Sequence, residues 1–106
     1  FQSRTSIDKL SNILKIPMIY GGLYKYEGHV SIFNYKDGPS YSEIFPYPNK
    51  DIGSCDNSGT IGMISGIIGN FQALEAIKVI VGIDHNLSGK LLIYDALSHD
   101  INKIEL

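Results

Sequence analysis

The chain has 106 residues, of which 43% are hydrophobic and 10% aromatic, enough for one small folded domain over residues 1–106 and too many for disorder. Its 9 basic and 11 acidic residues give a formal net charge of −2, so no basic excess favours a nucleic-acid partner. The single cysteine excludes an internal disulfide framework and every multi-cysteine metal site.

The same residues predict a cytoplasmic protein that does not enter a membrane. The first residues carry no signal-peptide pattern. The most apolar stretch is interrupted by Gly62, Gly66 and Gly69, so no run is expected to reach membrane-spanning length. No metal site is predicted, because the histidines are scattered at spacings that match no common motif: His29, His85 and His99.

The first predicted elements are a helix and a hairpin. A helix over residues 5–15, ended by Pro17, follows from apolar residues at three- and four-residue spacing: Ile7, Leu10, Ile13 and Leu14. Strands are predicted over 18–26 and 29–35, with a tight turn at Glu27-Gly28. Alternating tyrosines share one face of the first strand, which favours packing in a core or subunit contact and leaves partner docking open: Tyr20, Tyr24 and Tyr26.

Residues 40–58 form a long connection, of a length that is often functional in a compact domain. It contains Cys55, shortly before a second predicted helix, where the positive end of the helix dipole favours the thiolate. The charge of the neighbouring Asp56 opposes that effect. A functional Cys55 and an inert one are therefore both open.

The main helix is predicted over residues 60–81, with Gly82 as its stop. One side is an apolar stripe: Ile61, Ile64, Ile68, Phe71, Leu74, Ile77 and Val81. Another side carries only small residues, which predicts close approach of a second backbone: Gly62, Gly66, Gly69, Ala73 and Ala76. Tight packing on a sheet is favoured there over a subunit interface. Residues 59–66 lack the Gly-Lys-Ser/Thr ending of a phosphate loop.

The last segment, residues 90–106, predicts two strands around a Ser98-His99-Asp100 turn. The order of elements is then helix, hairpin, long loop, long helix and hairpin. That order predicts an α+β fold with mainly antiparallel hairpins packed on one long helix. No strand is followed by a glycine-rich loop and a helix, so no complete nucleotide site is expected in this chain.

Ordered motifs run along nearly the whole chain: Tyr20-Gly21-Gly22, the run from Tyr26 to Asn34, Asp37-Gly38-Pro39, Gly53-Ser54-Cys55, Gly59-Thr60-Ile61-Gly62, Gly66-Ile67-Ile68-Gly69, the run from Gln72 to Lys78, the run from Leu87 to Leu92, and Asp95-Ala96-Leu97. Together they resemble the second half of the MoeB/ThiF/HesA adenylyltransferases, relatives of the ubiquitin-activating enzymes. The resemblance implies an α+β fragment of a larger α/β fold whose Rossmann-like, ATP-binding half is absent here.

The resemblance also implies an activity. Members use ATP and magnesium to adenylylate the C-terminal glycine of a ubiquitin-like sulfur carrier, for thiamin or molybdopterin synthesis, and a homodimer is expected. Arg4 matches the basic residue that ends a motif whose magnesium-associated Asp would lie before Phe1. This segment alone is therefore expected to be inactive, with most of the ATP and magnesium site outside it.

Further site residues follow from the same resemblance. Cys55 matches a cysteine that links covalently to the carrier in some members and is dispensable in others. Substrate-binding positions are matched by Arg4 and, in the loop that crosses the carrier tail, by Ser54, Asp56 and Ser58. Many members carry Cys-x-x-Cys where this chain has Ser40-Tyr41-Ser42-Glu43, so no structural zinc is expected.

Two other kinds of function remain as alternatives. The missing ATP half and the small-residue side of the long helix favour a non-catalytic module that binds the carrier or forms dimers. Cys55 by itself would suit a thiol-based sulfur relay.

Overall fold

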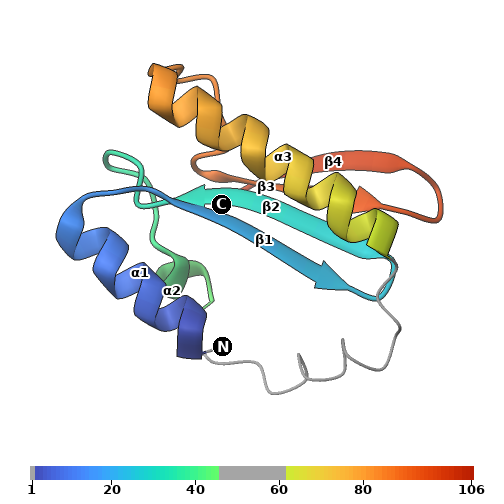
Figure 1. Ribbon diagram of the computed structural model, residues 1–106, viewed down its shortest axis with the longest axis horizontal. Coiled ribbons are helices and arrows are strands. Elements are labelled where there is room, and N and C mark those ends of the chain that lie inside the picture. Colours follow the sequence, from blue (N-terminus) through green and yellow to red (C-terminus); the bar gives the residue numbers. More distant parts are fainter. Residues whose placement is uncertain (1, 46–61) are drawn as a thin grey trace.

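The computed structural model describes residues 2–45 and 62–106, which form one antiparallel sheet with helices on both sides (Figure 1). The sheet has four strands in the order β1-β2-β3-β4. Helix α3 runs over one face, above β1 and β2, and α1 and α2 lie on the other side. The elements are α1 (Gln2–Leu14), β1 (Met18–Tyr24), β2 (Glu27–Phe33), α2 (Tyr41–Ile44), α3 (Gly62–Val81), β3 (Lys90–Asp95) and β4 (Asp100–Glu105). The predicted α+β class and antiparallel pairing are confirmed.

The turn of the first hairpin differs from the prediction. It lies at Lys25 and Tyr26, with Lys25 in the left-handed region at φ 54°, and Tyr24 pairs with Glu27. Gly28 is not a turn residue but a buried position of β2. A Cβ on Gly28 would lie 2.3 Å from Cδ1 of Ile68, so the glycine lets α3 pack closely on the sheet.

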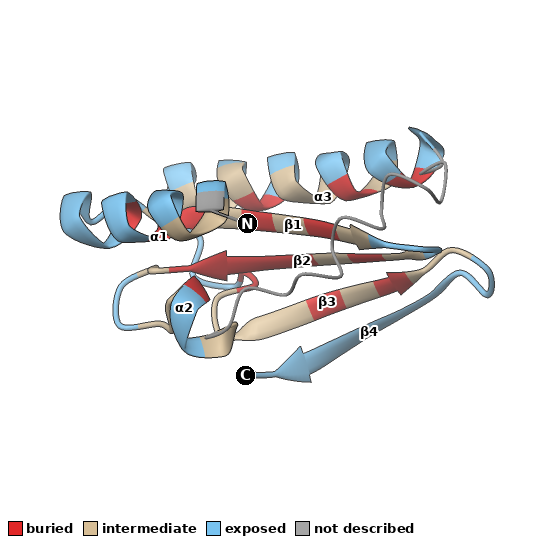
Figure 2. Cartoon of the chain, turned by 90° about the horizontal axis from the view of Figure 1, so that it is seen from below, coloured by how far each residue is buried: buried red, intermediate tan, exposed pale blue. Residues whose placement is uncertain are grey.

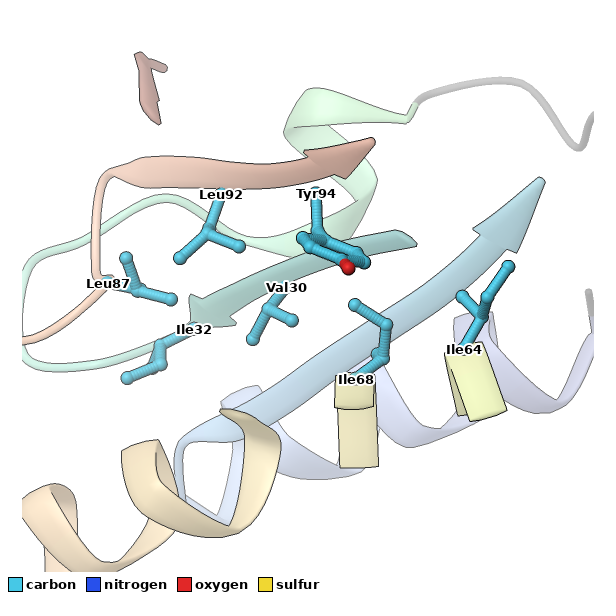
Figure 3. Packing of buried hydrophobic residues seen from close by; sticks show 7 residues of the cluster. All are labelled: Val30, Ile32, Ile64, Ile68, Leu87, Leu92 and Tyr94. Carbon is cyan, nitrogen blue, oxygen red and sulfur yellow. The ribbon is translucent and has the colours of Figure 1, made fainter. Parts of the chain in front are cut away.

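The main core lies between α3 and the sheet (Figure 3). Its side chains alternate along the strands, because successive residues of a strand point to opposite faces. Val30 and Ile32 from β2 are fully buried and meet Ile64 and Ile68 from α3. The complete buried set is Val30, Ile32, Ile64, Ile68, Leu87, Leu92 and Tyr94.

The small-residue side of α3 does not pack on the sheet, so the favoured prediction of tight helix-on-sheet packing is wrong. A Cβ on Gly62, Gly66 or Gly69 would meet nothing within 4 Å. The buried residues of the helix are Ile64, Ile68 and Glu75. Large side chains fill the layer between helix and sheet, and the close approach is provided by glycines of the strands instead. The later members of the predicted apolar stripe are exposed: Leu74, Ile77 and Val81.

By length and composition alone, α3 could cross a membrane. It has 20 residues, and the mean hydropathy of its most apolar window is 1.4, so the expectation that no apolar run reaches such a length is wrong. In this fold one side of the helix packs on the sheet, although only 17% of that window is buried. Most of its remaining surface is therefore apolar and uncovered in the described part of the chain.

Helix α1 turns its polar side to the protein and its apolar side outward. Most of the helix is accordingly coloured as exposed in Figure 2. Asp8 is 3% exposed and Ser11 is 7% exposed. The apolar residues that predicted the helix are all more than half exposed: Ile7, Leu10, Ile13 and Leu14. The periodicity predicted the helix correctly, and the side that faces the rest of the fold is the polar one.

A second, aromatic cluster lies on the sheet face opposite α3. Its buried members are Met18, Tyr20, Phe33 and Tyr41. The prediction of core packing is confirmed for Tyr20, whereas Tyr24 and Tyr26 are each 48% exposed. Strand β4 at the far edge of the sheet is exposed along its whole length.

Candidate functional site around Arg4

Arg4 lies where α1 meets the outer edge of β1. Its Nη2 donates a hydrogen bond of 2.9 Å to the carbonyl oxygen of Gly21. Its guanidinium carbon lies 5.2 Å from the centre of the Tyr20 ring, within the range of a cation–π contact. The Gly21 carbonyl and the Tyr20 ring thus both contact the Arg4 guanidinium, and the Arg4 side chain is only partly buried.

The ring beneath Arg4 is part of the aromatic cluster. The Tyr20 ring centre is 5.5 Å from that of Phe33, 5.6 Å from Tyr41 and 5.5 Å from Phe45. Burial raises the pKa of the Tyr20 hydroxyl; the Arg4 cation opposes that rise and Tyr41 adds to it. Tyr20 is therefore a neutral ring at pH 7, and the Arg4 guanidinium lies over a buried aromatic cluster.

Asp8 lies one helical turn after Arg4 and joins α1 to α2 and to the end of β2. Its Oδ1 accepts hydrogen bonds from Asn34 Nδ2 at 2.9 Å and from the Tyr41 backbone N–H at 3.0 Å. Its Oδ2 accepts from the Ser42 backbone N–H at 3.3 Å and from the Ser42 hydroxyl. Both oxygens of this buried carboxylate are thus occupied.

The charge of Asp8 is favoured by these donors. Burial by itself raises the pKa of the Asp8 carboxyl, but the hydrogen bonds from Ser42, Asn34 and the Tyr41 backbone outweigh it, so the pKa lies below its ordinary value. The sequence analysis did not single out Asp8. A signal was present, because Arg4, Asp8 and Ser11 recur at helical spacing and share one polar side of the helix.

The segment Ser40-Tyr41-Ser42-Glu43 forms a capping box at the start of α2. The Ser40 hydroxyl oxygen accepts from the Glu43 backbone N–H at 3.2 Å, and Glu43 Oε1 accepts from the Ser40 backbone N–H at 2.9 Å. These are the two positions that match the family's cysteines. Within residues 2–45 and 62–106, no group of three or more His, Cys, Asp or Glu side chains is placed to hold a metal ion.

Two polar residues of α3 tie the helix to neighbouring backbone. Glu75 is 4% exposed; its Oε1 accepts from the Leu87 backbone N–H at 2.8 Å, and its Oε2 pairs with Lys78 at 2.7 Å. Gln72 Nε2 lies 3.4 Å from the Ile19 carbonyl, at the same strand as the Arg4 contact. Gln72 therefore attaches α3 to β1, and Glu75 attaches it to the segment that precedes β3.

The structure places only one of the predicted site residues. Arg4 is described and lies at the edge of β1. The loop residues Ser54, Cys55, Asp56 and Ser58 lie outside the described residues. The histidines have separate settings: His29 contacts Glu27 at 2.9 Å, His99 contacts the Tyr94 hydroxyl at 2.7 Å, and His85 is exposed.

The fold is shared with a larger solved protein. The crystal structure of selenomethionine PaaA matches 99% of this chain and 40% of its own chain, with a TM-score of 0.68 and 18% sequence identity. The class defined by the fold is therefore a small α+β unit with an antiparallel sheet. The ThiF family model matches residues 1–106, and the chain belongs to the ThiF family.

Several curated proteins are similar over most of the chain. A probable molybdopterin-synthase adenylyltransferase of Gracilaria tenuistipitata var. liui is 45% identical over 107 residues, covering 100% of this chain and 30% of the relative. The molybdopterin-synthase adenylyltransferase of Haemophilus influenzae is 39% identical over 97% of this chain and 43% of its own length. The adenylyltransferase and sulfurtransferase MOCS3 of Culex quinquefasciatus is 38% identical over 89% of this chain and 22% of its own length. The chain thus spans less than half of each of these relatives.

Proposed function

We propose that this chain is part of an ATP-dependent adenylyltransferase that acts on the C-terminal glycine of a ubiquitin-like sulfur carrier in molybdopterin synthesis. Membership of the ThiF family and the names of the similar proteins support this reading. Residues 1–106 would form one unit of the larger α/β enzyme, the part that docks the carrier and contributes to a dimer. Thiamin synthesis is the second pathway, which the same motifs would serve.

The observation that carries this proposal is the position of Arg4. A guanidinium has five donors in a planar fork, which suits it to carboxylates and phosphates. Gly21 and the Tyr20 ring hold the Arg4 group at the edge of β1 while its side chain stays partly exposed. Arg4 would therefore bind an anionic group, either the carrier carboxylate or a phosphate of ATP.

The reaction joins these two anions. The carrier carboxylate attacks the α-phosphorus of ATP, a C–O–P bond forms, and the bond to pyrophosphate breaks, so the products are an acyl-adenylate and pyrophosphate. A carboxylate is a poor electrophile, and the mixed anhydride supplies AMP as a leaving group for the later transfer of sulfur. Arg4 would reduce the repulsion between the two anions by pairing with one of them.

ATP and magnesium are proposed for the complete enzyme, and residues outside this chain would hold most of both. Arg4 is the described residue whose chemistry fits part of that site, as a partner for an anion. Zinc is not expected at α2, since Ser40 and Glu43 stand at the cysteine positions and hydrogen-bond to each other's backbone. Cys55 would be the thiol for a covalent carrier link, with Ser54, Asp56 and Ser58 as neighbouring contacts to the carrier tail.

The proposed homodimer is supported by the uncovered side of α3. Met63 is 74% exposed and Ile80 is 82% exposed, and the glycines between them leave a surface without side chains. We propose a cytoplasmic protein in which this surface is buried against a second copy of the chain and not in a membrane.

A non-catalytic docking module is the second candidate function. It is favoured by the same uncovered surface on the small-residue side of α3. The two candidates differ in whether ATP is consumed, because a docking module would bind the carrier without forming AMP adducts.

The deciding experiment uses the full-length protein, ATP and two purified carriers, one of the thiamin type and one of the molybdopterin type. Intact-mass spectrometry measures the AMP adduct on each carrier. We expect an adduct on the molybdopterin-type carrier, and a lower but measurable rate of its formation in Arg4→Ala. Saturable binding with no adduct on either carrier would favour the docking module instead.

A further inference from the structure

Helix α1 is rotated about its own axis so that its apolar stripe faces away from the sheet. An isolated amphipathic helix lowers its free energy by burying its apolar stripe. In α1 the stripe is exposed, with Leu10 at 56% and Ile13 at 73%, while Asp8 is buried at 3%. The buried side makes polar contacts that join the helix to β1 and to α2.

Two of these contacts lie one turn apart on the same side of the helix. Arg4 and Asp8 are at positions i and i+4, so their side chains project from one face. Arg4 is attached to β1 through the Gly21 carbonyl, and Asp8 is attached to the start of α2 through the backbone N–H groups of Tyr41 and Ser42. These two attachments define the rotation of α1 relative to β1 and to α2.

The two points are also joined through the aromatic cluster. The Tyr41 N–H is bound to Asp8, and the Tyr41 ring packs 5.6 Å from the Tyr20 ring. Tyr20 is the ring over which the Arg4 guanidinium lies. The Asp8 carboxylate therefore holds both the helix that carries Arg4 and the residue that supports the ring beneath it.

We propose that Asp8 is a positioning residue for Arg4: its buried carboxylate sets the rotation of α1 and thereby the place of the guanidinium at the edge of β1. This inference rests on the proposed function, in which Arg4 binds an anionic group of the substrates. Asp8 itself touches no substrate. Its effect is on binding, because a displaced guanidinium no longer meets the anion at the right place.

Asp8→Asn is the sharpest variant. It keeps the size of the side chain, but it removes the charge and sets an NH2 group or a single oxygen where the Ser42 N–H and hydroxyl donate. The matched control is Asp100→Asn, the same change at an exposed position of β4. Ser42→Ala is a milder second variant, since it removes one donor from Asp8 and leaves the carboxylate in place.

The experiment measures KM for ATP and for the carrier, and kcat for AMP transfer, in the full-length protein. We expect Arg4→Ala to raise one KM at least tenfold, Asp8→Asn to raise the same KM several-fold, and Ser42→Ala to raise it less. Asp100→Asn should match the wild type. The decisive arm is the double variant Arg4→Ala/Asp8→Asn, whose KM should equal that of Arg4→Ala alone.

Each other outcome has a definite meaning. If Asp8→Asn raises KM by the same factor with and without Arg4, Asp8 acts only on the general structure and the inference is wrong. The inference is also wrong if Asp8→Asn and Ser42→Ala both leave KM unchanged. If the wild type forms no AMP adduct, the proposed function itself has failed, whereas an adduct that survives Arg4→Ala with unchanged KM overturns the role of Arg4 alone. If Asp8→Asn does not fold, Ser42→Ala with and without Arg4→Ala supplies the same comparison.

Discussion

The side chain of Ile68 in α3 fills the space that a Cβ on Gly28 in β2 would need. A Cβ on Gly28 would lie 2.3 Å from both Cδ1 and Cγ1 of Ile68, which is itself 3% exposed. The glycine therefore sets the distance between the long helix and the sheet. Figure 3 shows Ile68 pointing from α3 toward β2 among the other buried side chains.

Gly28→Ala should destabilise the protein by about 1–3 kcal/mol, because the added methyl forces a well-packed isoleucine out of its position. Thermal or denaturant unfolding of the full-length protein measures the change. Gly21→Ala is the matched comparison: its Cβ would meet the end of the Gln72 side chain at 2.4 Å, and that flexible group can move aside. Equal losses for the two variants would contradict the packing argument.

In contrast to Gly28→Ala, Gly66→Ala should stabilise the protein if this side of α3 faces water. A Cβ there meets nothing within 4 Å, and replacing a helical glycine by alanine gains roughly 1 kcal/mol. If a second copy packs against this side, as the proposed dimer requires, the same change should weaken dimerisation. Sedimentation velocity of wild type and Gly66→Ala over a range of concentrations distinguishes the two. A wild type that stays monomeric at all concentrations would contradict the dimer.

Glu75→Ala should destabilise the fold by about 1–3 kcal/mol or more, since it leaves the buried N–H of Leu87 without its acceptor. It also removes the partner of Lys78. The control is Glu105→Ala, at an exposed position of β4. Hydrogen exchange of the Leu87 amide supplies a local measure, and protection unchanged from wild type would show that another acceptor replaces the carboxylate.

Asp8 should give the fold an acid-sensitive contribution to stability. The folded pKa lies below the ordinary value of 3.8, so the folded state favours the ionised carboxylate. That contribution is present in full above the unfolded pKa and is lost as the pH falls through the folded pKa. Asp8→Asn should therefore lower stability at pH 7 and flatten its dependence on pH below about 4. Urea unfolding at a series of pH values tests this, and parallel curves for variant and wild type would refute it.

The class of the fold and most of its elements could be predicted from the sequence, because period and turn chemistry are local properties. The strands around residues 18–24 and 90–105 and both long helices lie close to their predicted places. The hairpin turn was misplaced because Gly28 looks like a turn residue in isolation. Its real constraint is the Ile68 side chain, which lies forty positions further along the chain.

For the site, the motif match identified Arg4 as a candidate, but it did not identify what holds Arg4. The helical spacing of Arg4 and Asp8 puts them on one side of α1, but it does not show what Asp8 binds. The donors to Asp8 come from Asn34, Tyr41 and Ser42, on segments that meet α1 only in the folded state. The contact between Arg4 and the Tyr20 ring likewise depends on how α1 docks against β1.

By itself, the sequence determined that α1 and α3 are helices and that the strands pair as hairpins, since hydrophobic spacing decides local conformation. Which side of each helix faces the sheet was decided only by the tertiary structure. On α1 the side that carries Asp8 and Arg4 makes hydrogen bonds to neighbouring segments, and on α3 Ile64 and Ile68, not the small residues, meet the sheet. The physical reason is that a helix presents several faces, and the partner surface selects among them by the contacts that it offers.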